Sequence, residues 1–211
     1  MLLNPELINL TAEHDRYLNA QRNHKSKDKE RILKSNFRSY KVMQKHLPLT
    51  CTSILDIGCG LGIMDLYLFE HYGRDKTINF NLFDKTEYPE KIHFGFKETA
   101  SFYNDLNLSK KILADYGISE SKVNTIEASI ENLREIENID LIISCIAWGF
   151  HFPVSTYVQE VYDIMNENSV LILDLREDTG GVEELSKFFD VEIIRHKGVT
   201  VTVCCKKTQV N

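Results

Sequence analysis

The sequence predicts an α/β fold with a mostly parallel sheet, and three observations support this prediction. After residue 50, short apolar runs typical of buried strands alternate with amphipathic runs typical of helices. A glycine-rich loop at 58–62 follows the first of these apolar runs. Near the end of the chain, Lys197-Gly198 separates two runs in the manner of a β-hairpin. We therefore expect crossover helices on both faces of a sheet that ends with an antiparallel strand.

The composition fits one globular domain. The 211 residues include 25 Lys and Arg against 31 Asp and Glu, which gives a net charge of −6. Hydrophobic residues at 43% and charged residues at 27% argue against disordered and fibrous classes. The acidic balance argues against a nucleic-acid partner. Because no apolar run approaches the roughly 20 residues of a membrane span and the N-terminus lacks a basic signal segment, we expect a cytoplasmic protein without membrane contact.

The cysteines and histidines give no support for a metal site. The five cysteines are an odd number and contain no C-x-x-C pair. The adjacent Cys204 and Cys205 would point to opposite faces of a strand, which is poor geometry for sharing a metal ion. The seven histidines are scattered along the chain. We therefore expect reduced, mostly buried thiols and no metal.

Residues 1–50 predict a helical cap that belongs to the same domain as the rest of the chain. Their apolar residues recur at three-to-four spacing, the period of an amphipathic helix. The basic stretch at 24–31 is interrupted by acids, which favours a solvated loop and helix start over a nucleic-acid patch. We expect the cap to reach the substrate. Its apolar face consists of Leu33, Phe37, Tyr40, Met43 and Leu47.

Residues 51–211 predict the core of the domain, in which strands and helices alternate. The expected strands are 53–57, 78–83, 123–126, 140–146, 169–175, 191–196 and 199–205. The expected helices are 63–72, 106–116, 129–136, 153–165 and 182–189. Pro153 suits the first turn of its helix. The excursion at 85–122 is too long for a structureless connection, so we expect it to form a lid or a substrate wall.

The sharpest motif is Ile54-Leu55-Asp56-Ile57-Gly58-Cys59-Gly60-Leu61-Gly62, where a buried strand turns into a helix. Glycines there allow a tight turn and a close approach of ligand to backbone. Open α/β sheets bind ligands at the carboxyl ends of such strands. A dinucleotide fingerprint would need glycine at position 63, which is Ile63 here. Asp56 would repel a pyrophosphate and attract an amine, so a dinucleotide is disfavoured.

This stretch resembles motif I of the class I S-adenosylmethionine (SAM) methyltransferases, whose pattern is close to [V/I/L]-L-D-x-G-C-G-x-G. The resemblance extends over about residues 50–206. It implies a Rossmann-like sheet of seven strands in the order 3-2-1-4-5-7-6, with the last strand antiparallel. It also implies SAM as cofactor and S-adenosylhomocysteine as product. The residues assigned to the cofactor on this basis are Asp56, Gly58, Cys59, Gly60, Gly62, Asp84, Glu127, Ala128 and Ser144.

The resemblance gives three of these residues particular roles. Asp84, at the end of the second strand, would accept hydrogen bonds from both ribose hydroxyls. Glu127 would accept from the adenine amino group, and a backbone N–H near Ala128 would serve the adenine ring. The alternative for Glu127 and Ala128 is an N-cap region for the helix that starts at Ser129.

Residues 144–153, after the fourth strand, would face the methyl group and the substrate in this family. The segment is the densest aromatic patch of the chain, and Trp148 and Phe150 are predicted to form pocket wall. His151 is the candidate catalytic base, because an imidazole titrates near neutral pH and can deprotonate a hydroxyl nucleophile. The alternative is that His151 is a hydrogen-bonded packing residue at a helix start.

A second resemblance concerns the acceptor. The stretch 148–157 and the segment Phe102-Tyr103-Asn104-Asp105-Leu106 are similar to bacterial sugar O-methyltransferases. This similarity implies a small polar acceptor, such as a hydroxyl of a sugar, a glycan or capsule precursor, or a nucleotide-linked precursor. It also makes Tyr103 and Asn104 substrate-contact candidates, with surface packing as the alternative. The excursion at 85–122 departs from simpler family members.

Two other functions remain open at this point. Methylation of RNA or protein would need a basic face, which the net charge and the mixed charges at 24–31 do not indicate. The chain also lacks an Asn-Pro-Pro-Tyr type of motif after the fourth strand. A non-catalytic SAM-binding or assembly protein would keep the glycine loop and Asp84 without needing His151. The oligomeric state is not specified by any pattern in the sequence.

Overall fold

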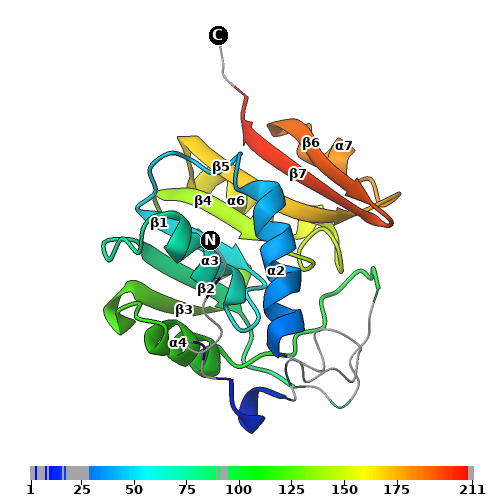
Figure 1. Cartoon of the computed structure of the whole chain (residues 1–211). Coiled ribbons are helices and arrows are strands. Elements are labelled where there is room, and N and C mark those ends of the chain that lie inside the picture. The colour runs from blue at the N-terminus through cyan, green and yellow to red at the C-terminus, as the bar shows by residue number, and fades with distance from the viewer. Residues whose placement is uncertain are drawn as a thin grey trace.

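The computed structural model of the protein describes residues 3, 8, 10–15, 17, 29–88, 90 and 95–208 (Figure 1). Its seven strands form one sheet in the order β3-β2-β1-β4-β5-β7-β6. Only β7 runs antiparallel to its neighbours, β5 and β6. The predicted order and the predicted antiparallel last strand are therefore confirmed. The strands are β1 (Ser53–Ile57), β2 (Asn79–Asp84), β3 (Val123–Glu127), β4 (Ile139–Ser144), β5 (Met165–Arg176), β6 (Phe189–Lys197) and β7 (Thr200–Lys207).

Helices cover both faces of the sheet because its central strands are apolar on both sides. Ile54 of β1 belongs to one hydrophobic cluster and its neighbour Leu55 to the other. The first face carries α2 (Lys29–Met43), α3 (Ile63–His71) and α4 (Leu106–Asp115), and α2 crosses in front of the sheet in Figure 1. The second face carries α5 (Ile130–Arg134), α6 (Val158–Ile164) and α7 (Gly181–Leu185), and the 3-10 turns are η2 (Glu120–Lys122) and η3 (Val154–Thr156).

The five cysteines are unpaired thiols. Cys204 lies in the cluster on one face of the sheet and Cys205 in the cluster on the other, as their adjacency in a strand predicts. Among the described residues, no group of His, Cys, Asp or Glu side chains is arranged to hold a metal ion. No helix in that part of the chain is long and apolar enough to span a membrane.

Several boundaries differ from the sequence prediction. The strand expected at 169–175 already begins at Met165, the strand expected at 140–146 ends at Ser144, and the helix expected at 129–136 spans Ile130–Arg134. The helix expected at 153–165 is divided into η3 and α6, because the backbone of Tyr157 leaves the helical region at φ −135°. Pro153 precedes η3 instead of opening an α-helix. The helix expected at 182–189 ends at Leu185, and Phe189 already starts β6. Most of the basic stretch at 24–31 lies outside the described residues.

The Tyr157 ring explains the break between η3 and α6. It packs edge-on against Phe83 at 5.5 Å between ring centroids and against Phe152 at 5.9 Å. These contacts place residue 157 in the second hydrophobic cluster. Local helix propensity is therefore overridden by aromatic packing under the end of β2.

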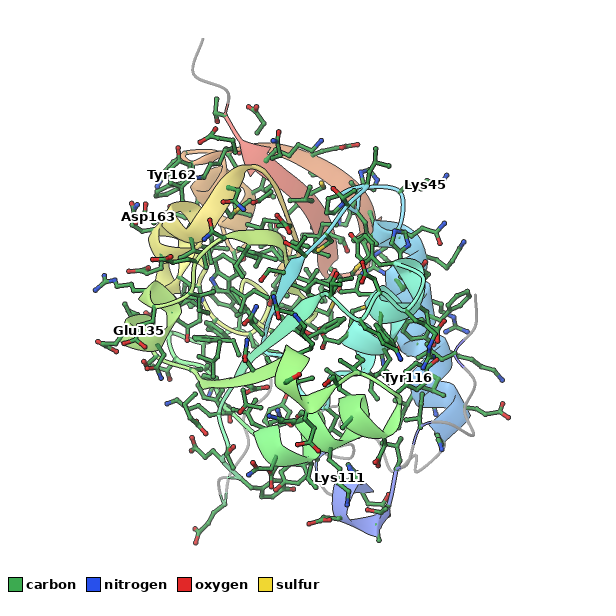
Figure 2. All side chains as sticks on the ribbon, turned by 90° about the vertical axis from the view of Figure 1, so that its left-hand side faces the viewer. Lys45, Lys111, Tyr116, Glu135, Tyr162 and Asp163 are labelled. Carbon is green, nitrogen blue, oxygen red and sulfur yellow. The ribbon has the colours of Figure 1, made fainter. Side chains whose placement is uncertain are left out.

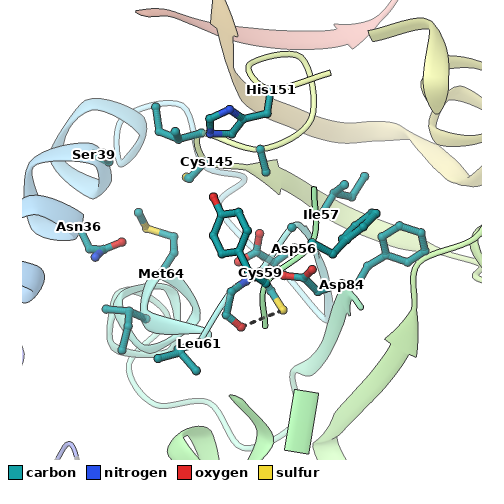
Figure 3. A pocket seen from close by; sticks show the side chains of 18 of the residues that line it. Asn36, Ser39, Asp56, Ile57, Cys59, Leu61, Met64, Asp84, Cys145 and His151 are labelled. Carbon is teal, nitrogen blue, oxygen red and sulfur yellow. Dashed lines mark hydrogen bonds between the residues drawn. The ribbon is translucent and has the colours of Figure 1, made fainter. Parts of the chain in front are cut away.

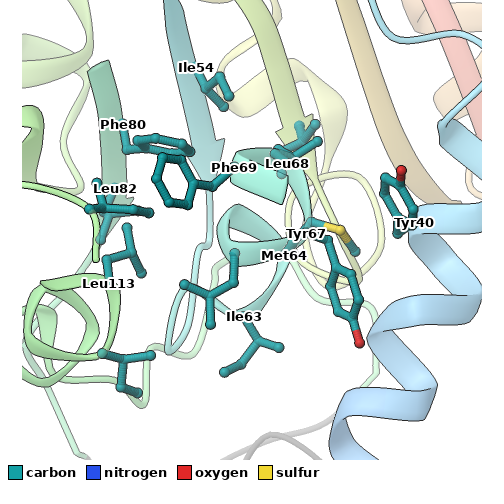
Figure 4. Close-up of a cluster of buried hydrophobic side chains, with 14 of the residues drawn as sticks. Tyr40, Ile54, Ile63, Met64, Tyr67, Leu68, Phe69, Phe80, Leu82 and Leu113 are labelled. Atoms are coloured by element: carbon teal, nitrogen blue, oxygen red, sulfur yellow. The ribbon is translucent and has the colours of Figure 1, made fainter. Parts of the chain in front are cut away.

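The N-terminal helix α2 is attached to the core through α3 (Figure 4). Tyr40 of α2 stacks on Tyr67 of α3 with ring centroids 5.6 Å apart. The Tyr67 hydroxyl donates a hydrogen bond of 2.9 Å to the carbonyl of Leu33. Met43 and Ile32 add buried apolar contacts on the same side. Stacking and the buried hydrogen bond together fix α2 on α3.

Replacing Tyr67 with Phe should lower the free energy of unfolding by about 1 kcal/mol, because it removes one buried hydrogen bond and keeps the ring. Urea unfolding followed by circular dichroism measures this change. Tyr162→Phe is the matched control, since Tyr162 lies at the periphery of the molecule (Figure 2), and it should have little effect. Equal stability of the wild type and Tyr67→Phe would show that the hydroxyl does not hold α2.

Candidate functional site

A cavity of about 470 Å³ lies at the carboxyl ends of β1, β2 and β4. Its volume is within the usual range for a small-molecule site. In Figure 3, Asn36 and Ser39 lie on the α2 side of this cavity, and His151 lies above Asp56 and Asp84. Besides the ends of β1 and β2, four segments form its walls: α2, the loop after β1 with the start of α3, the excursion at 100–103, and the segment after β4. The α2 residues are Arg31, Ile32, Ser35, Asn36, Arg38 and Ser39.

The glycine loop depends on backbone conformations that side chains disfavour. Gly58, Gly60 and Gly62 have φ of 74°, 53° and 69°. A Cβ on Gly58 would also overlap the Cβ of Ala147, so this glycine lets the loop lie directly against the segment after β4. A Cβ on Gly62 would lie 2.5 Å from the Leu113 side chain. Gly62 lies outside the cavity wall and serves as the N-cap residue of α3 against α4.

Asp84 lies in the cavity wall at the end of β2 and is 6% exposed. Its Oδ1 accepts from the Lys85 N–H at 2.8 Å, and its Oδ2 accepts from the Gly60 N–H at 2.9 Å. The side-chain amide of Asn104 also donates to Oδ2, at 3.2 Å. A carboxylate has about four lone-pair positions, so this arrangement leaves one position open on Oδ1. Burial raises the pKa of Asp84 to about 6, and the three donors oppose that rise.

Asn104 holds the glycine loop in place and does not line the cavity. It is 1% exposed and absent from the cavity wall. Its amide donates to the Gly60 carbonyl at 2.7 Å, and the Ser109 hydroxyl donates to the same carbonyl at 2.6 Å. The structure therefore places this predicted substrate-contact residue behind Asp84. Its neighbour Tyr103 does line the cavity, and burial raises the pKa of the Tyr103 hydroxyl.

Asp56, at the end of β1, forms a buried pair with Asp65 of α3. Asp56 lines the cavity, whereas Asp65 is fully buried beneath it. Both Asp65 oxygens lack a hydrogen-bond donor among the described residues, and the Asp56 carboxyl group faces them. One proton shared between the two carboxyl groups supplies that donor. Burial raises the pKa of both groups, and the negative charge of Asp65 raises that of Asp56 further.

Besides Gly62, three further residues predicted to touch the cofactor lie outside the cavity wall. The Ser144 hydroxyl donates to the Ile57 carbonyl at 2.8 Å and ties β4 to β1 beneath the loop. The exposed Glu127 directs its carboxylate to the Thr86 N–H at 3.3 Å. Ala128 is buried and donates its N–H to the Asp84 carbonyl at 2.8 Å. The N-cap alternative applies to the next residue, because the Ser129 side chain caps α5.

The two aromatic residues predicted as pocket wall also lie elsewhere. Trp148 is fully buried, and its indole N–H donates to the Val154 carbonyl at 3.0 Å. It belongs to the second hydrophobic cluster because the chain turns inward after β4. Phe150 is 7% exposed and packs under the Arg176 guanidinium, 4.4 Å from its ring centroid. Phe102 and Tyr157 supply aromatic surface to the cavity instead.

His151 lies in the cavity wall near Cys145 (Figure 3). Its Nδ1 lies 3.2 Å from the Gly95 carbonyl oxygen. A carbonyl oxygen can only accept, so Nδ1 carries the proton and the lone pair of the neutral ring is on Nε2. The two thiols of the cavity wall, Cys59 and Cys145, are neutral, because burial raises the pKa of each well above its usual range. The imidazole is therefore the side chain of this group that is suited to accept a proton.

Sequence reasoning missed Asp65 and the individual cavity residues of α2. Asp65 is an acid among buried apolar residues, which is a signal for a buried partner. The α2 residues 31, 35 and 38 recur at helical spacing, as do 32, 36 and 39. This second face was visible in the sequence, but its position over the cavity depends on how α2 packs on α3.

Comparisons with known proteins give structural matches without sequence matches. A scan against protein-family models gives no match, and a search of curated proteins gives none. Among solved structures, a precorrin-6y C5,15-methyltransferase from Geobacter metallireducens GS-15 matches with TM-score 0.55 and 13% identity, over 81% of this chain and 88% of that one. A ribosomal protein L11 methylase from Lactobacillus delbrueckii subsp. bulgaricus gives 0.56 and 11%, over 83% and 80%.

An rRNA methylase from Streptococcus thermophilus gives a TM-score of 0.55 at 16% identity, over 82% of this chain and 95% of that one. At these identities the likeness shows the fold, which is that of the class I SAM-dependent methyltransferases. The expectation drawn from motif I is thereby confirmed for the fold. The names of the three proteins refer to chemically different acceptors, so the fold does not select among acceptors.

The shared proton of Asp56 and Asp65 predicts a pH-dependent stability. A carboxyl group whose pKa is raised by folding stabilises the protein below its unfolded pKa, and this contribution is lost as the pH rises through the folded pKa. Asp65→Asn supplies a permanent N–H donor to Asp56. It should therefore raise the free energy of unfolding relative to the wild type by about 1–3 kcal/mol more at pH 8 than at pH 5.

Urea unfolding at the two pH values measures this difference. Asp163→Asn is the matched control, because Asp163 is an exposed residue of α6 at the periphery (Figure 2). The control should change stability equally at both pH values. If Asp65→Asn also shows no pH-dependent gain, the two carboxyl groups do not share a proton.

Proposed function

We propose that the protein is a SAM-dependent methyltransferase that acts on a small polar acceptor. The observation that supports this most directly is the arrangement of two acids around a glycine loop at one end of the cavity. Asp56 is the last residue but one of β1, Asp84 ends β2, and the loop at 58–62 follows β1 and donates the Gly60 N–H to Asp84. Motif I and the class I fold give the same indication independently.

Each of these residues has a chemical match in the proposed cofactor. The open lone-pair position on Asp84 Oδ1 suits a ribose hydroxyl donor. Asp56 suits the ammonium group of the amino-acid end, and its pairing with Asp65 supplies negative charge when the shared proton leaves. The glycines let the ligand approach the backbone. When bound, SAM would supply an electrophilic methyl group on a sulfonium.

The residues after β4 complete the site. The Nδ1–H bond to Gly95 orients the His151 ring and places its lone pair on Nε2. In this tautomer Nε2 accepts the proton of an acceptor hydroxyl as its oxygen attacks. Tyr103, Phe102 and Tyr157 provide apolar surface that excludes water from this region.

The acceptor is inferred from the shape of the site and from the second resemblance. The wall formed by α2 and by 100–103 makes the cavity a pocket suited to a small molecule rather than an open face for a macromolecule. The stretch 148–157 resembles sugar O-methyltransferases, so a sugar hydroxyl or a glycan precursor is the acceptor class that we propose.

Cofactor binding is tested by titrating S-adenosylhomocysteine into the protein by calorimetry. Gly58→Ala should weaken binding by about tenfold or more, because its Cβ overlaps Ala147 and displaces the loop. Gly73→Ala is the matched control. Gly73 also has positive φ, but a Cβ at this position would meet nothing within 4 Å, so its variant carries the backbone strain without the overlap. Absence of binding by the wild type would overturn the proposed function.

His151→Asn tests the base. The Asn amide can keep a donor toward Gly95 but cannot accept a proton near neutral pH. With an acceptor that the wild type methylates, kcat should fall by about 100-fold or more. The affinity for S-adenosylhomocysteine should stay unchanged, which separates loss of proton transfer from loss of structure. Undiminished turnover would contradict the assignment of His151 as base.

A further inference from the structure

The α2 wall of the cavity carries a charge opposite to that of the cofactor end. Arg31 and Arg38 are the cationic residues of α2 in the wall, and both are exposed at its rim. The two arginines are seven residues, and so about two helical turns, apart on the same face of α2. This face is turned away from the contacts with α3. The acidic residues of the wall, Asp56 and Asp84, lie on the ends of the strands instead.

This separation of charge has a direct consequence for what binds where. The cationic groups of the proposed cofactor are attracted to Asp56 and Asp84 and repelled by the arginines. A guanidinium prefers a planar, bidentate partner such as a carboxylate or phosphate. Within the described part of the chain, Arg38 has neither a hydrogen bond nor an ion pair. The α2 rim is therefore suited to an anionic group.

Two sources can supply that anion: the carboxylate of the cofactor and a charged group on the acceptor. The position of Arg38 favours the acceptor. In Figure 3, Ser39 lies on the His151 side of the cavity, whereas Asn36 lies on the Met64 side, near the glycine loop. Arg38 is the residue before Ser39, so its backbone lies at nearly the same height along α2 as that of Ser39.

We propose that the acceptor carries a phosphate or carboxylate group that Arg38 binds at the mouth of the cavity, while its hydroxyl faces His151. Ser35 and Ser39, on the same face of α2, supply hydroxyl donors beside the guanidinium. The acceptor class is then an anionic small molecule, such as a sugar phosphate or a uronate. This inference rests on the proposed function, because it assigns the acceptor end of the same cavity.

The test uses the full-length protein saturated with S-adenosylhomocysteine. Glucose, glucose 6-phosphate, glucuronate and inorganic phosphate are titrated into it separately. The two anionic sugars should bind at least about tenfold more tightly than glucose, and added salt should reduce this advantage. Arg38→Gln should abolish the advantage while leaving the affinity for S-adenosylhomocysteine unchanged. Lys41→Gln is the matched control, because Lys41 is an exposed cation of α2 outside the cavity wall, and it should keep the advantage.

The outcomes separate this inference from the proposed function. Failure of S-adenosylhomocysteine to bind the wild type refutes the proposed function itself. Normal cofactor binding with equal affinity for glucose and its anionic derivatives, or with no binding of any anionic probe, overturns only the anion assignment. A loss of S-adenosylhomocysteine affinity in Arg38→Gln, with the ratio between anionic and neutral probes preserved, assigns the guanidinium to the carboxylate of the cofactor and also overturns it.

Discussion

The site depends on one buried carboxylate. Asp84 is where the end of β2, the glycine loop and the excursion meet, through its bonds to the N–H groups of Lys85 and Gly60 and to the Asn104 amide. A carboxylate removed from water is costly unless donors surround it. Because those donors come from separate segments, stabilising the charge also fixes the loop and the excursion relative to the sheet. The same carboxylate lines the cavity and keeps one lone-pair position without a donor.

The pattern of strands could be predicted because burial on both faces of a sheet leaves continuous apolar runs. The run at 53–57 became β1 with the same bounds, and the hairpin was visible from Lys197-Gly198. Motif I located the loop because the backbone there needs positive φ, which favours glycine. A requirement of this local kind is visible in the sequence as a glycine. The break in the helix at Tyr157 could not be predicted in this way, because it comes from packing against Phe83, which is distant in the sequence.

The candidate site was predictable only in part, for a similar reason. Asp56, Asp84 and His151 line the cavity, as expected from their positions at or after the ends of strands. Tyr103 also lines it, as the resemblance of the segment 102–106 led us to expect. Trp148 was predicted to form pocket wall because it is aromatic. Whether an aromatic side chain lines a pocket depends on where the backbone points it, and here the backbone points Trp148 into the hydrophobic core. The contribution of α2 depends on how that helix packs on α3, which no local pattern specifies. Asp65 stands out in the sequence as an acid among buried apolar residues of α3, but its partner Asp56 is known only once α3 is placed on the sheet.

The contact between Gly58 and Ala147 has a consequence for altering the specificity of this scaffold. The loop at the proposed cofactor end and the segment at the proposed acceptor end touch without any intervening side chain. A larger residue at position 147 would press on the loop as well as reshape the acceptor end, so the two properties cannot be tuned separately there. Positions on α2 belong to a separate wall of the cavity that is not part of this contact. Variant libraries for binding new acceptors are therefore best made at positions on that helix, where substitutions disturb the proposed cofactor end least.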